Sequence, residues 1–471
     1  MNREFFAGKT VLVMGLGRFG GGIDVARFAH GAGAKVIVTD LASDEQLSDS
    51  IDQLRDLDGI EFHLGSHAPA DFEQSDIIVA NPAVPSDNTF LQIARQANKF
   101  VTSQISIFFE LCPAKIIGIT GANGKSTTTA LTAHLLKNTS DERRATSDEH
   151  VWLSGNIGNQ PLLTTIDKIN PDDLVVLELS SFQLEQLAEI QKAPDVALLT
   201  NLTPNHLDRY GTFENYCAAK ENIFKFQNRD DDRPAISIFN AEDKNGIEWF
   251  EKYKNDANRI CIKFSADDVN DELRKCFALP GRANLSNLAA AMAVAGLFSI
   301  SDDDIKNALP TFKALPHRLE LVGKINGVSW YNDSKATTPE GAITALEAFD
   351  QPTIIIAGGY DKNLSFDKLG QKIAEKSKAA ILIGTTAHKI ARAIQNAKMS
   401  LRGAKRRSNL NQRDTKIELV DSIAEAVQLA NQLAETGDVV LLSSACASYD
   451  RFDNYEQRGR EFTKLVRALN S

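Results

Sequence analysis

The sequence predicts an α/β protein with three domains, and three observations support this prediction. Short apolar runs typical of buried strands alternate with helix-period segments along the chain. The 471 residues suit about three domains of ordinary size. Glycine-rich turns directly follow two of the apolar runs, as they do in parallel sheets that bind nucleotides. We place the domains at residues 1–112, 113–314 and 315–471, with Pro113 just before the second glycine-rich turn.

The first domain opens with a nucleotide-binding fingerprint. An apolar strand over Lys9–Met14 leads into Gly15-Leu16-Gly17-Arg18-Phe19-Gly20, a helix to about Ala32 and a second strand that ends at Asp40. This unit predicts a Rossmann-like domain with a phosphate at the helix N-terminus. Asp40 could bond a ribose or simply end its strand. Taken alone, the unit is typical of an NAD-dependent dehydrogenase.

The second domain begins with the most informative stretch of the chain, residues 115–129. An apolar run ends in a glycine-rich loop, and Gly124-Lys125-Ser126 then opens a helix rich in Thr and Ala. Backbone N–H groups and the helix dipole favour an anion there, Lys125 would reach the β- and γ-phosphates, and Ser126 would bind Mg²⁺. Ile119 stands where a strict phosphate loop has glycine. We predict a P-loop, ATPase-like domain that binds a mononucleotide; a glycine-rich turn beside a surface lysine is the alternative.

Polar side chains stand where predicted strands end, so that they would face the ligand crevice of a parallel sheet. Asn81 follows a strand in the first domain, and Glu178 and His206 follow strands in the second. Glu178 is a candidate Mg²⁺ ligand or base, or else a helix-capping acid. His206 is a candidate metal ligand or substrate contact, or else a satisfied loop histidine. Lys220 lies in an amphipathic helix, where the pattern alone predicts a surface lysine.

The third domain repeats this arrangement. Three strand-like runs, at residues 353–357, 380–383 and 438–442, each end in glycines, serines or a lysine. The pattern is typical of an open α/β sheet with ligands at the strand ends, so it predicts a second Rossmann-like domain.

Composition excludes several classes of protein. The formal net charge is −10 and no long basic run occurs, which argues against a nucleic-acid or membrane-surface partner. The sequence has no apolar run of 18 residues and no apolar leader segment. Its five scattered cysteines lack metal-ligand spacing and suggest reduced thiols. We therefore expect a cytoplasmic protein.

Together the motifs resemble the ATP-dependent Mur ligases. Gly118-x-Thr120-Gly121-x-Asn123-Gly124-Lys125-Ser126 is similar to their phosphate loop, which differs from the strict pattern. Further blocks resemble the member of the family that adds D-glutamate: Glu178–Glu185, Pro316–Arg318, Asn332–Thr337, and Leu442–Ser448 with Asn454–Gly459. The resemblance spans the chain and implies an amide ligase that joins D-glutamate to UDP-N-acetylmuramoyl-L-alanine through an acyl phosphate, giving ADP and phosphate, in peptidoglycan precursor synthesis.

For the nucleotide site, the resemblance implies ATP, two Mg²⁺ ions and a lysine carbamate formed from CO₂. The implied catalytic residues are Lys125, Glu178, His206 and Lys220. The implied metal ligands are Ser126, Glu178, His206 and carbamylated Lys220. The implied ATP-binding residues are Gly121, Asn123, Gly124, Lys125, Ser126, Thr127, Asn287, Arg318 and Asp333.

For the other substrates, the resemblance implies that the first domain binds the UDP group, which replaces the dehydrogenase interpretation, and that the third binds D-glutamate. The implied UDP-substrate residues are Gly17, Arg18, Phe19, Asp40, Asn81, Asn156 and Ser181. The implied D-glutamate residues are Thr337, Lys362, Ser448 and Tyr455. The protein would act on small molecules as a monomer, without nucleic acid or membrane.

Some positions depart from the family pattern: Ala122, Ala283, Ser444 and Tyr455 stand where threonine, histidine, proline and phenylalanine are common. These departures concern substrate contacts rather than the class of reaction. Two other functions stay as hypotheses. One is an NAD(P)-dependent oxidoreductase, from the motif at 15–40, and the other is an ATP-binding switch without catalysis, from the phosphate loop alone.

Overall fold

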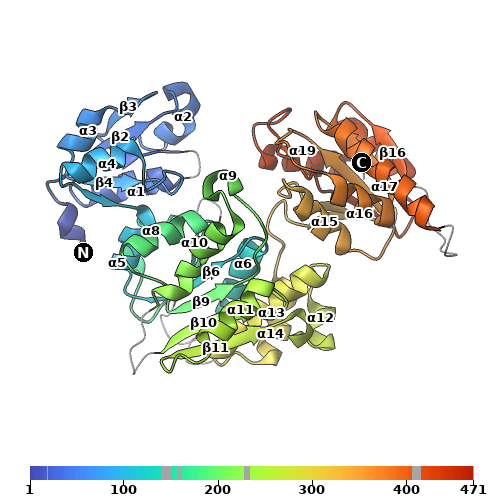
Figure 1. The fold of residues 1–471 in the computed structure, drawn as a ribbon, viewed down its shortest axis with the longest axis horizontal. Coiled ribbons are helices and arrows are strands. Elements are labelled where there is room, and N and C mark those ends of the chain that lie inside the picture. The colour runs from blue at the N-terminus through green and yellow to red at the C-terminus, as the bar shows by residue number, and fades with distance from the viewer. Residues whose placement is uncertain (18–19, 139–149, 158–160, 228–233, 406–414, 470–471) are drawn as a thin grey trace. The chain divides into compact units, whose positions relative to one another are not determined.

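The protein is a three-sheet α/β structure (Figure 1). The computed structural model describes residues 1–17, 20–138, 150–157, 161–227, 234–405 and 415–469, without the side chains of 401–405. The chain forms two compact units. The first consists of Met1–Asp268 and Asn287–Ala308, and the second of Val269–Ser286 and Leu309–Ser471. The chain therefore passes between the units three times, once inside helix α13.

The first sheet is fully parallel, with the order β3-β2-β1-β4-β5. Strands β1 and β4 follow each other in the sheet but not in the chain, so ligand-binding loops diverge at their carboxyl ends. The strands are β1 (Thr10–Met14), β2 (Lys35–Asp40), β3 (Glu61–Leu64), β4 (Ile77–Ala80) and β5 (Phe100–Thr102). The helices are α1 (Gly21–Gly31), α2 (Asp44–Asp52), α3 (Pro69–Gln74), α4 (Thr89–Gln96) and α5 (Gln104–Leu111).

The second sheet is also parallel, with the order β11-β10-β9-β6-β8-β7. Its strands are β6 (Lys115–Thr120), β7 (Val151–Gly155), β8 (Leu174–Glu178), β9 (Val196–Leu199), β10 (Ala235–Asn240) and β11 (Arg259–Phe264). Helices of this region are α6 (Lys125–Lys137), α8 (Ser181–Glu189), α9 (Leu207–Tyr210), α10 (Phe213–Lys225), α11 (Lys244–Tyr253) and α14 (Asp302–Ala308). One continuous apolar core, which runs from Phe6 to Trp249, joins this sheet to the first.

The third sheet has the order β12-β13-β17-β14-β15-β16, and β12 runs antiparallel to β13 while the other pairs are parallel. Its strands are β12 (Glu320–Ile325), β13 (Val328–Asn332), β14 (Thr353–Gly358), β15 (Ser377–Ile383), β16 (Lys416–Leu419) and β17 (Val439–Leu442). The helices are α15 (Pro339–Glu347), α16 (Asp367–Lys376), α17 (Ala387–Lys405), α18 (Ile423–Leu433) and α19 (Tyr455–Ala468), preceded in the chain by α12 (Asp271–Cys276) and α13 (Arg282–Leu297). Separate apolar clusters cover its two faces.

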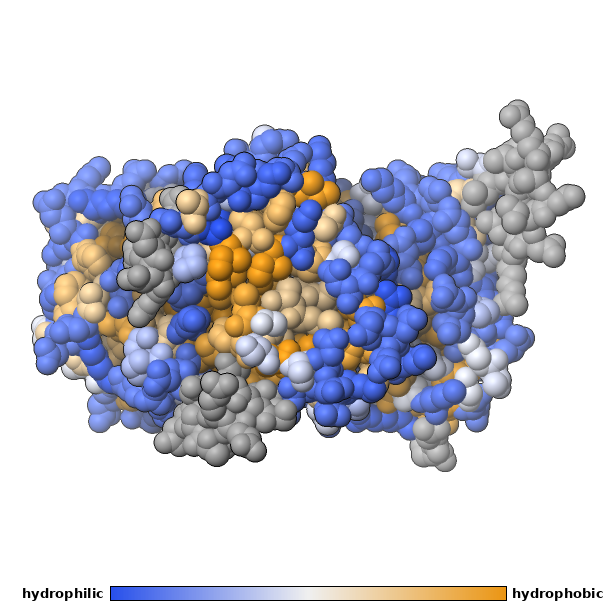
Figure 2. All heavy atoms as spheres, turned by 90° about the horizontal axis from the view of Figure 1, so that it is seen from below, coloured by the Kyte–Doolittle hydropathy of each residue, from blue (hydrophilic) through white to orange (hydrophobic). Residues whose placement is uncertain are grey.

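The three sheets confirm the predicted α/β class and its three-domain architecture. The boundaries at 112/113 and 314/315 stay predictions. No helix within the described part of the chain is long and apolar enough to cross a bilayer. Figure 2 shows one face of the molecule, on which apolar side chains interrupt a mostly hydrophilic surface.

Candidate active site

The phosphate loop joins β6 to α6 and is built as the sequence predicts. Gly124 precedes the first residue of α6 with a φ of 79°, a conformation that favours glycine. A Cβ atom there would lie 2.2 Å from Oδ1 of Asn287, so the position has no room for a side chain. Gly124 thus leads directly into the N-terminus of a 13-residue helix, the kind of position that binds anions.

The loop is fastened to the end of β9, the neighbour of β6. The N–H of Ala122 donates to the carbonyl of Asn201 at 2.7 Å. The N–H of Asn123 donates to Oδ1 of Asn201 at 3.0 Å, and Nδ2 of Asn201 returns a 3.0 Å bond to the carbonyl of Asn123. Lys125 Nζ donates to the carbonyl of Ala122 at 3.0 Å, so the lysine folds over the same loop.

Glu178 ends β8 beside the loop, and its carboxylate meets two other candidate residues. The Ser126 hydroxyl donates to Oε2, and Asn156 Nδ2 donates to Oε1 at 3.3 Å. Glu178 and Ser126 are each only 2% exposed. The capping interpretation of Glu178 is wrong, because Ser180 caps α8 instead. A buried carboxylate beside a hydroxyl offers the oxygen ligands that Mg²⁺ prefers.

Lys220 is buried, so the surface lysine predicted from the helix pattern is wrong. The side chain is 1% exposed, because its face of α10 packs on β6. Nζ donates to the Thr120 hydroxyl at 3.1 Å. Burial first, and then the charge of Lys125, lowers the pKa of Lys220 well below its usual value, although Glu178 raises it. The amine is therefore disposed to be neutral.

His206 lies just before α9 in a left-handed conformation, with a φ of 52°. Its ring centre is 5.1 Å from that of Phe182 and 6.4 Å from that of Tyr216. Burial lowers the pKa of its imidazole, which favours the neutral form that binds metals. Its ring nitrogens make no hydrogen bond to another described residue. The alternative interpretation, a loop histidine whose hydrogen bonds are satisfied within the protein, is therefore not supported.

The candidate metal ligands are an unusual set. Among the residues that the structure covers, no three His, Cys, Asp or Glu side chains are grouped to hold a metal ion. The resemblance implies four metal ligands. Only Glu178 and His206 are of these residue types, and the other two ligands are Ser126 and Lys220. A lysine in that place fits a metal site only if it carries an acidic group.

In the first sheet, three predicted residues lie at the carboxyl ends of β1, β2 and β4. The Asp40 carboxylate accepts the N–H of Gly17 at 3.1 Å and that of Ala42 at 2.9 Å, so it shapes the glycine-rich turn. Asn81 Nδ2 donates to the carbonyl of Gly15 at 3.4 Å. Arg18 and Phe19 lie outside the described residues, and Ser181 is the first residue of α8.

In the second unit, the predicted amino-acid residues follow neighbouring strands. Thr337, Ser448 and Lys362 lie in the loops after β13, β17 and β14, which are adjacent in the sheet. Tyr455 begins α19, and its hydroxyl accepts a 3.0 Å bond from Lys335 Nζ. The four residues thus follow the carboxyl ends of neighbouring strands of this sheet.

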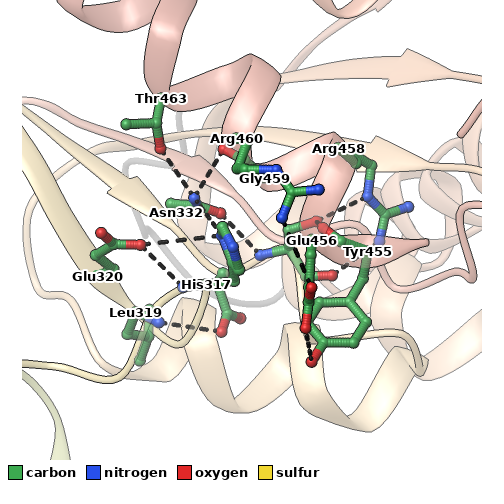
Figure 3. Close-up of polar contacts among 12 residues, drawn as sticks. His317, Leu319, Glu320, Asn332, Tyr455, Glu456, Arg458, Gly459, Arg460 and Thr463 are labelled. Carbon is green, nitrogen blue, oxygen red and sulfur yellow. Dashed lines mark hydrogen bonds and ion pairs between the residues drawn. The ribbon is translucent and has the colours of Figure 1, made fainter. Parts of the chain in front are cut away.

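The segment around His317 fixes α19 to the strands (Figure 3). Asn332 Nδ2 lies 3.0 Å from His317 Nδ1, 3.0 Å from the carbonyl of Gly459 and 3.1 Å from Thr463 Oγ1. A Cβ atom on Gly459 would lie 2.2 Å from His317 Nδ1, so the ring rests directly on the helix. His317, Asn332 and Gly459 stand in motifs of the sequence without a predicted role, and no motif includes Thr463.

Two further features of this unit matter for the site. Asp333 accepts the Ser443 hydroxyl at 2.8 Å and the N–H of Leu319 at 3.2 Å, and burial raises its pKa to about 7. Arg458, 1% exposed, donates to the hydroxyl and carbonyl of Ser334 at 2.9 and 2.8 Å and to the carbonyl of Cys446 at 3.2 Å. It thereby ties the loop after β13 to the loop after β17. Asn287 belongs to the first unit, whereas Arg318 and Asp333 belong to the second.

Family models match three parts of the chain. They are the Mur ligase MurD-like N-terminal domain over residues 9–103, the Mur ligase middle domain over 119–295 and the Mur ligase glutamate ligase domain over 317–446. A UDP-N-acetylmuramoylalanine--D-glutamate ligase of Roseiflexus sp. (strain RS-1) is 39% identical over 98% of this chain and 99% of that protein. A ligase of the same name from Acetivibrio thermocellus is 37% identical over 98% of this chain and 97% of that protein.

Solved structures share the fold. UDP-N-acetylmuramate-alanine ligase MurC from Thermotoga maritima has a TM-score of 0.57 at 17% identity, over 98% of this chain and 99% of that one. The MurF ligase of Thermotoga maritima, solved with ADP, has a TM-score of 0.55 at 17% identity, over 98% and 96%. The full-length relatives set aside the oxidoreductase and the ATP-binding switch. The chain belongs to the Mur ligase family and is an ATP-dependent ligase that forms an amide bond.

Proposed function

We propose that the protein joins D-glutamate to UDP-N-acetylmuramoyl-L-alanine, with release of ADP and phosphate, in peptidoglycan precursor synthesis. The observation that supports this most is the full-length similarity to ligases named for these two substrates. The site supports it as well, because a phosphate loop, a glycine-rich turn and a set of amino-acid candidates each lie at the carboxyl edge of a separate sheet.

The nucleotide phosphates would bind at the N-terminus of α6. Gly121 and Gly124 would keep side chains away from the phosphates, while Asn123, Lys125, Ser126 and Thr127 would surround the anion. Asn287, Arg318 and Asp333 would contact the adenosine. Ser126 and Glu178 fit one Mg²⁺ ion because both are buried oxygen ligands in direct contact. Such an ion offsets charge on the transferred phosphoryl group.

A second Mg²⁺ would be held by His206 and by Lys220 as a carbamate. A charged ammonium at Lys220 would repel a cation, whereas a neutral amine can form an N–C bond to CO₂, release a proton and become an anionic carbamate ligand. The lowered pKa of Lys220 favours this neutral amine. Thr120, which accepts the hydrogen bond of Nζ, would orient the carbamate.

The reaction then follows in two steps. An oxygen of the acceptor carboxylate attacks the γ-phosphorus of ATP, the bond to the β,γ-bridging oxygen breaks, and an acyl phosphate and ADP form. The unprotonated amine of D-glutamate then attacks the acyl carbon, phosphate leaves and a proton is released. Lys125 and the loop N–H groups stabilise charge on the phosphoryl oxygens.

The remaining predicted residues would position the two other substrates. Gly17, Arg18, Phe19, Asp40, Asn81, Asn156 and Ser181 would contact the UDP-substrate. Thr337, Lys362, Ser448 and Tyr455 would hold the two carboxylates of D-glutamate. We further propose that the enzyme works as a monomer in the cytoplasm, on small molecules alone.

Phosphate release tests the substrates. The purified protein with ATP, Mg²⁺ and UDP-N-acetylmuramoyl-L-alanine is supplied with D-glutamate, L-glutamate, L-alanine or a diamino acid. We expect D-glutamate to stimulate phosphate release at least about tenfold over the others. Equal stimulation by another amino acid, or none by D-glutamate, contradicts the proposed specificity.

A further inference from the structure

A buried carboxylate at the start of α1 holds a loop that belongs to the second sheet. Asp24 lies in the first turn of α1 and is 5% exposed. Its Oδ2 accepts the N–H of Leu162 at 3.0 Å and that of Leu163 at 2.7 Å. Its Oδ1 accepts the N–H and the hydroxyl of Thr164 at 3.0 and 2.7 Å. Gln104 of α5 adds a fifth donor, at 2.6 Å.

The Asp24 carboxylate is held by hydrogen bonds rather than by a cation of the described residues. Among the described residues it forms no ion pair, so five N–H and O–H dipoles hold the carboxylate. Hydrogen bonds to a charged group contribute more to stability than bonds between neutral groups. Three consecutive loop N–H groups converge on one side chain, which fixes both the position and the direction of the loop.

The same connection between β7 and β8 starts beside Glu178 of the phosphate site. The N–H of Asn156 donates to the Glu178 carbonyl at 2.8 Å, while its side chain donates to the carboxylate at 3.3 Å. Gly155 lies so close to Glu178 that a Cβ atom would stand 2.4 Å from that carbonyl oxygen. Ser154 Oγ donates to the carbonyl of Pro161 at 3.2 Å and closes the base of the loop. The described residues before 158–160 thus contact Glu178, those after this range contact Asp24, and the bond from Ser154 to Pro161 joins the two parts.

Asp24 in turn belongs to the helix that follows the glycine-rich turn. That turn, Gly15 to Gly20, is the proposed binding site of the UDP group, whereas Glu178 belongs to the proposed site of the ATP phosphates. Other polar contacts between these two parts, within the described residues, include the ion pairs Arg3–Asp167 and Arg95–Glu189 and individual hydrogen bonds. Gln186 Nε2 donates to the carbonyl of Ala80 at 3.3 Å, and Arg209 Nη1 donates to that of Ala83 at 2.9 Å.

We propose that Asp24 is a positioning residue that aligns the UDP-substrate with the γ-phosphate of ATP. The proposal rests on the proposed function, in which a carboxylate bound through one sheet must attack a phosphorus bound at the other. A displacement of about 1 Å between such reactants lowers the rate by as much as a hundredfold. The Asp24 carboxylate acts through the loop, and only the backbone N–H of Asp24 meets the glycine-rich turn, where it donates to the Gly20 carbonyl at 2.9 Å.

The test separates binding from alignment. In Asp24→Asn, the amide NH₂ replaces one acceptor oxygen and opposes the loop N–H groups. We expect kcat at saturating substrates to fall at least about tenfold. The dissociation constants of UDP alone and of ADP alone, measured by calorimetry, should stay within about threefold of wild type. A structural defect that only lowers the folded fraction would reduce the binding stoichiometry as well.

Asp173→Asn is the matched control. Asp173, 1% exposed, accepts the N–H of His150 at 2.8 Å, that of Asn170 at 2.9 Å and Trp152 Nε1 at 2.8 Å, all within the second sheet's own surroundings. We expect its kcat to stay within about threefold of wild type after correction for the folded fraction.

Several outcomes overturn the proposal: a wild-type kcat in Asp24→Asn, an equal loss in Asp173→Asn, or a loss of UDP affinity with kcat unchanged. If Asp24→Asn does not fold, Thr164→Val decides, because it removes a single donor and keeps the backbone; an unchanged kcat there overturns the proposal. A wild-type enzyme without D-glutamate-dependent activity contradicts the proposed function instead, which is a separate result.

Discussion

The amine of Lys220 lies 3.1 Å from the hydroxyl of Thr120, the last residue of the strand that leads into the phosphate loop. Thr120 in turn donates to the carbonyl of Leu179 at 2.7 Å, next to Glu178. A residue that the helix pattern alone would put at the surface is thus attached to both strands of the proposed nucleotide site.

We expect Lys220→Ala to lower ATP-dependent phosphate release at least about a hundredfold, because the second proposed metal loses its anionic ligand. Acetate or propionate in the assay should restore part of the rate by supplying a carboxylate in the vacated space. Lys225→Ala, at the exposed end of the same helix, is the control and should keep wild-type activity. Wild-type rates in Lys220→Ala would contradict the carbamate.

Gly124→Ala should weaken ADP binding by about tenfold or more. The new methyl group would meet Asn287, and the φ of 79° is strained for alanine. Gly296 of α13 has open space around its Cβ position, so Gly296→Ala should leave ADP binding unchanged and stabilise the helix by about 0.5–1 kcal/mol. Calorimetric titration with ADP measures the first effect and thermal unfolding the second. Equal ADP affinities in both variants would contradict the described loop geometry.

Asp333 should make the protein less stable as the pH rises. Burial raises its pKa from 3.8 to about 7, although Ser443, Leu319 and the charge of Arg318 oppose the shift. Below about pH 4 the group is protonated in both states. Between about 4 and 7 it ionises first in the unfolded chain, which favours unfolding, and above 7 the loss is complete. Chemical denaturation from pH 5 to 8 should show this slope in the wild type and a flatter profile in Asp333→Asn. If the stability of the wild type and of Asp333→Asn changed with pH in the same way, the raised pKa of Asp333 would be refuted.

Ser444→Ala should stabilise the protein by about 1 kcal/mol. The Ser444 hydroxyl is buried and has no hydrogen-bond partner among the described residues, so it loses hydration without compensation. Ser443→Ala, one residue earlier, should have the opposite sign because that hydroxyl donates to Asp333. Denaturant titration of the two variants compares them directly. A loss of stability in Ser444→Ala would show that its hydroxyl is satisfied.

Local patterns predicted the parts of the fold that depend on neighbours in sequence. The apolar runs before Gly121 and Gly15 became β6 and β1, and the glycines that break them became the expected turns, because strand burial and positive φ angles are local requirements. The candidate ligands after β8 and β9 likewise lie at strand ends.

Contacts between distant segments were beyond such reasoning. The sheet order places β9 beside β6, and only this brings Asn201 to the phosphate loop, 78 residues from Asn123. The helix pattern predicts a surface position for Lys220, and only the packing of α10 on β6 buries it. From the sequence, Asp24 is an ordinary acidic residue in the first turn of a helix. Its role depends on contacts with residues 162–164, which belong to the second sheet and are distant in sequence. Motif resemblance named several site residues but not these supporting contacts.

The triple passage of the chain between the two units has a consequence for synthesis on the ribosome. Residues 287–308 complete the first unit, yet Val269–Ser286, which belongs to the second, is made before them. His134, near the end of the phosphate-loop helix, pairs with the carbonyl of Ala308 at 2.9 Å. A nascent chain that has reached residue 268 therefore still lacks part of its ATP-binding body, and the usual order in which an N-terminal domain finishes folding before the next begins cannot apply at this junction.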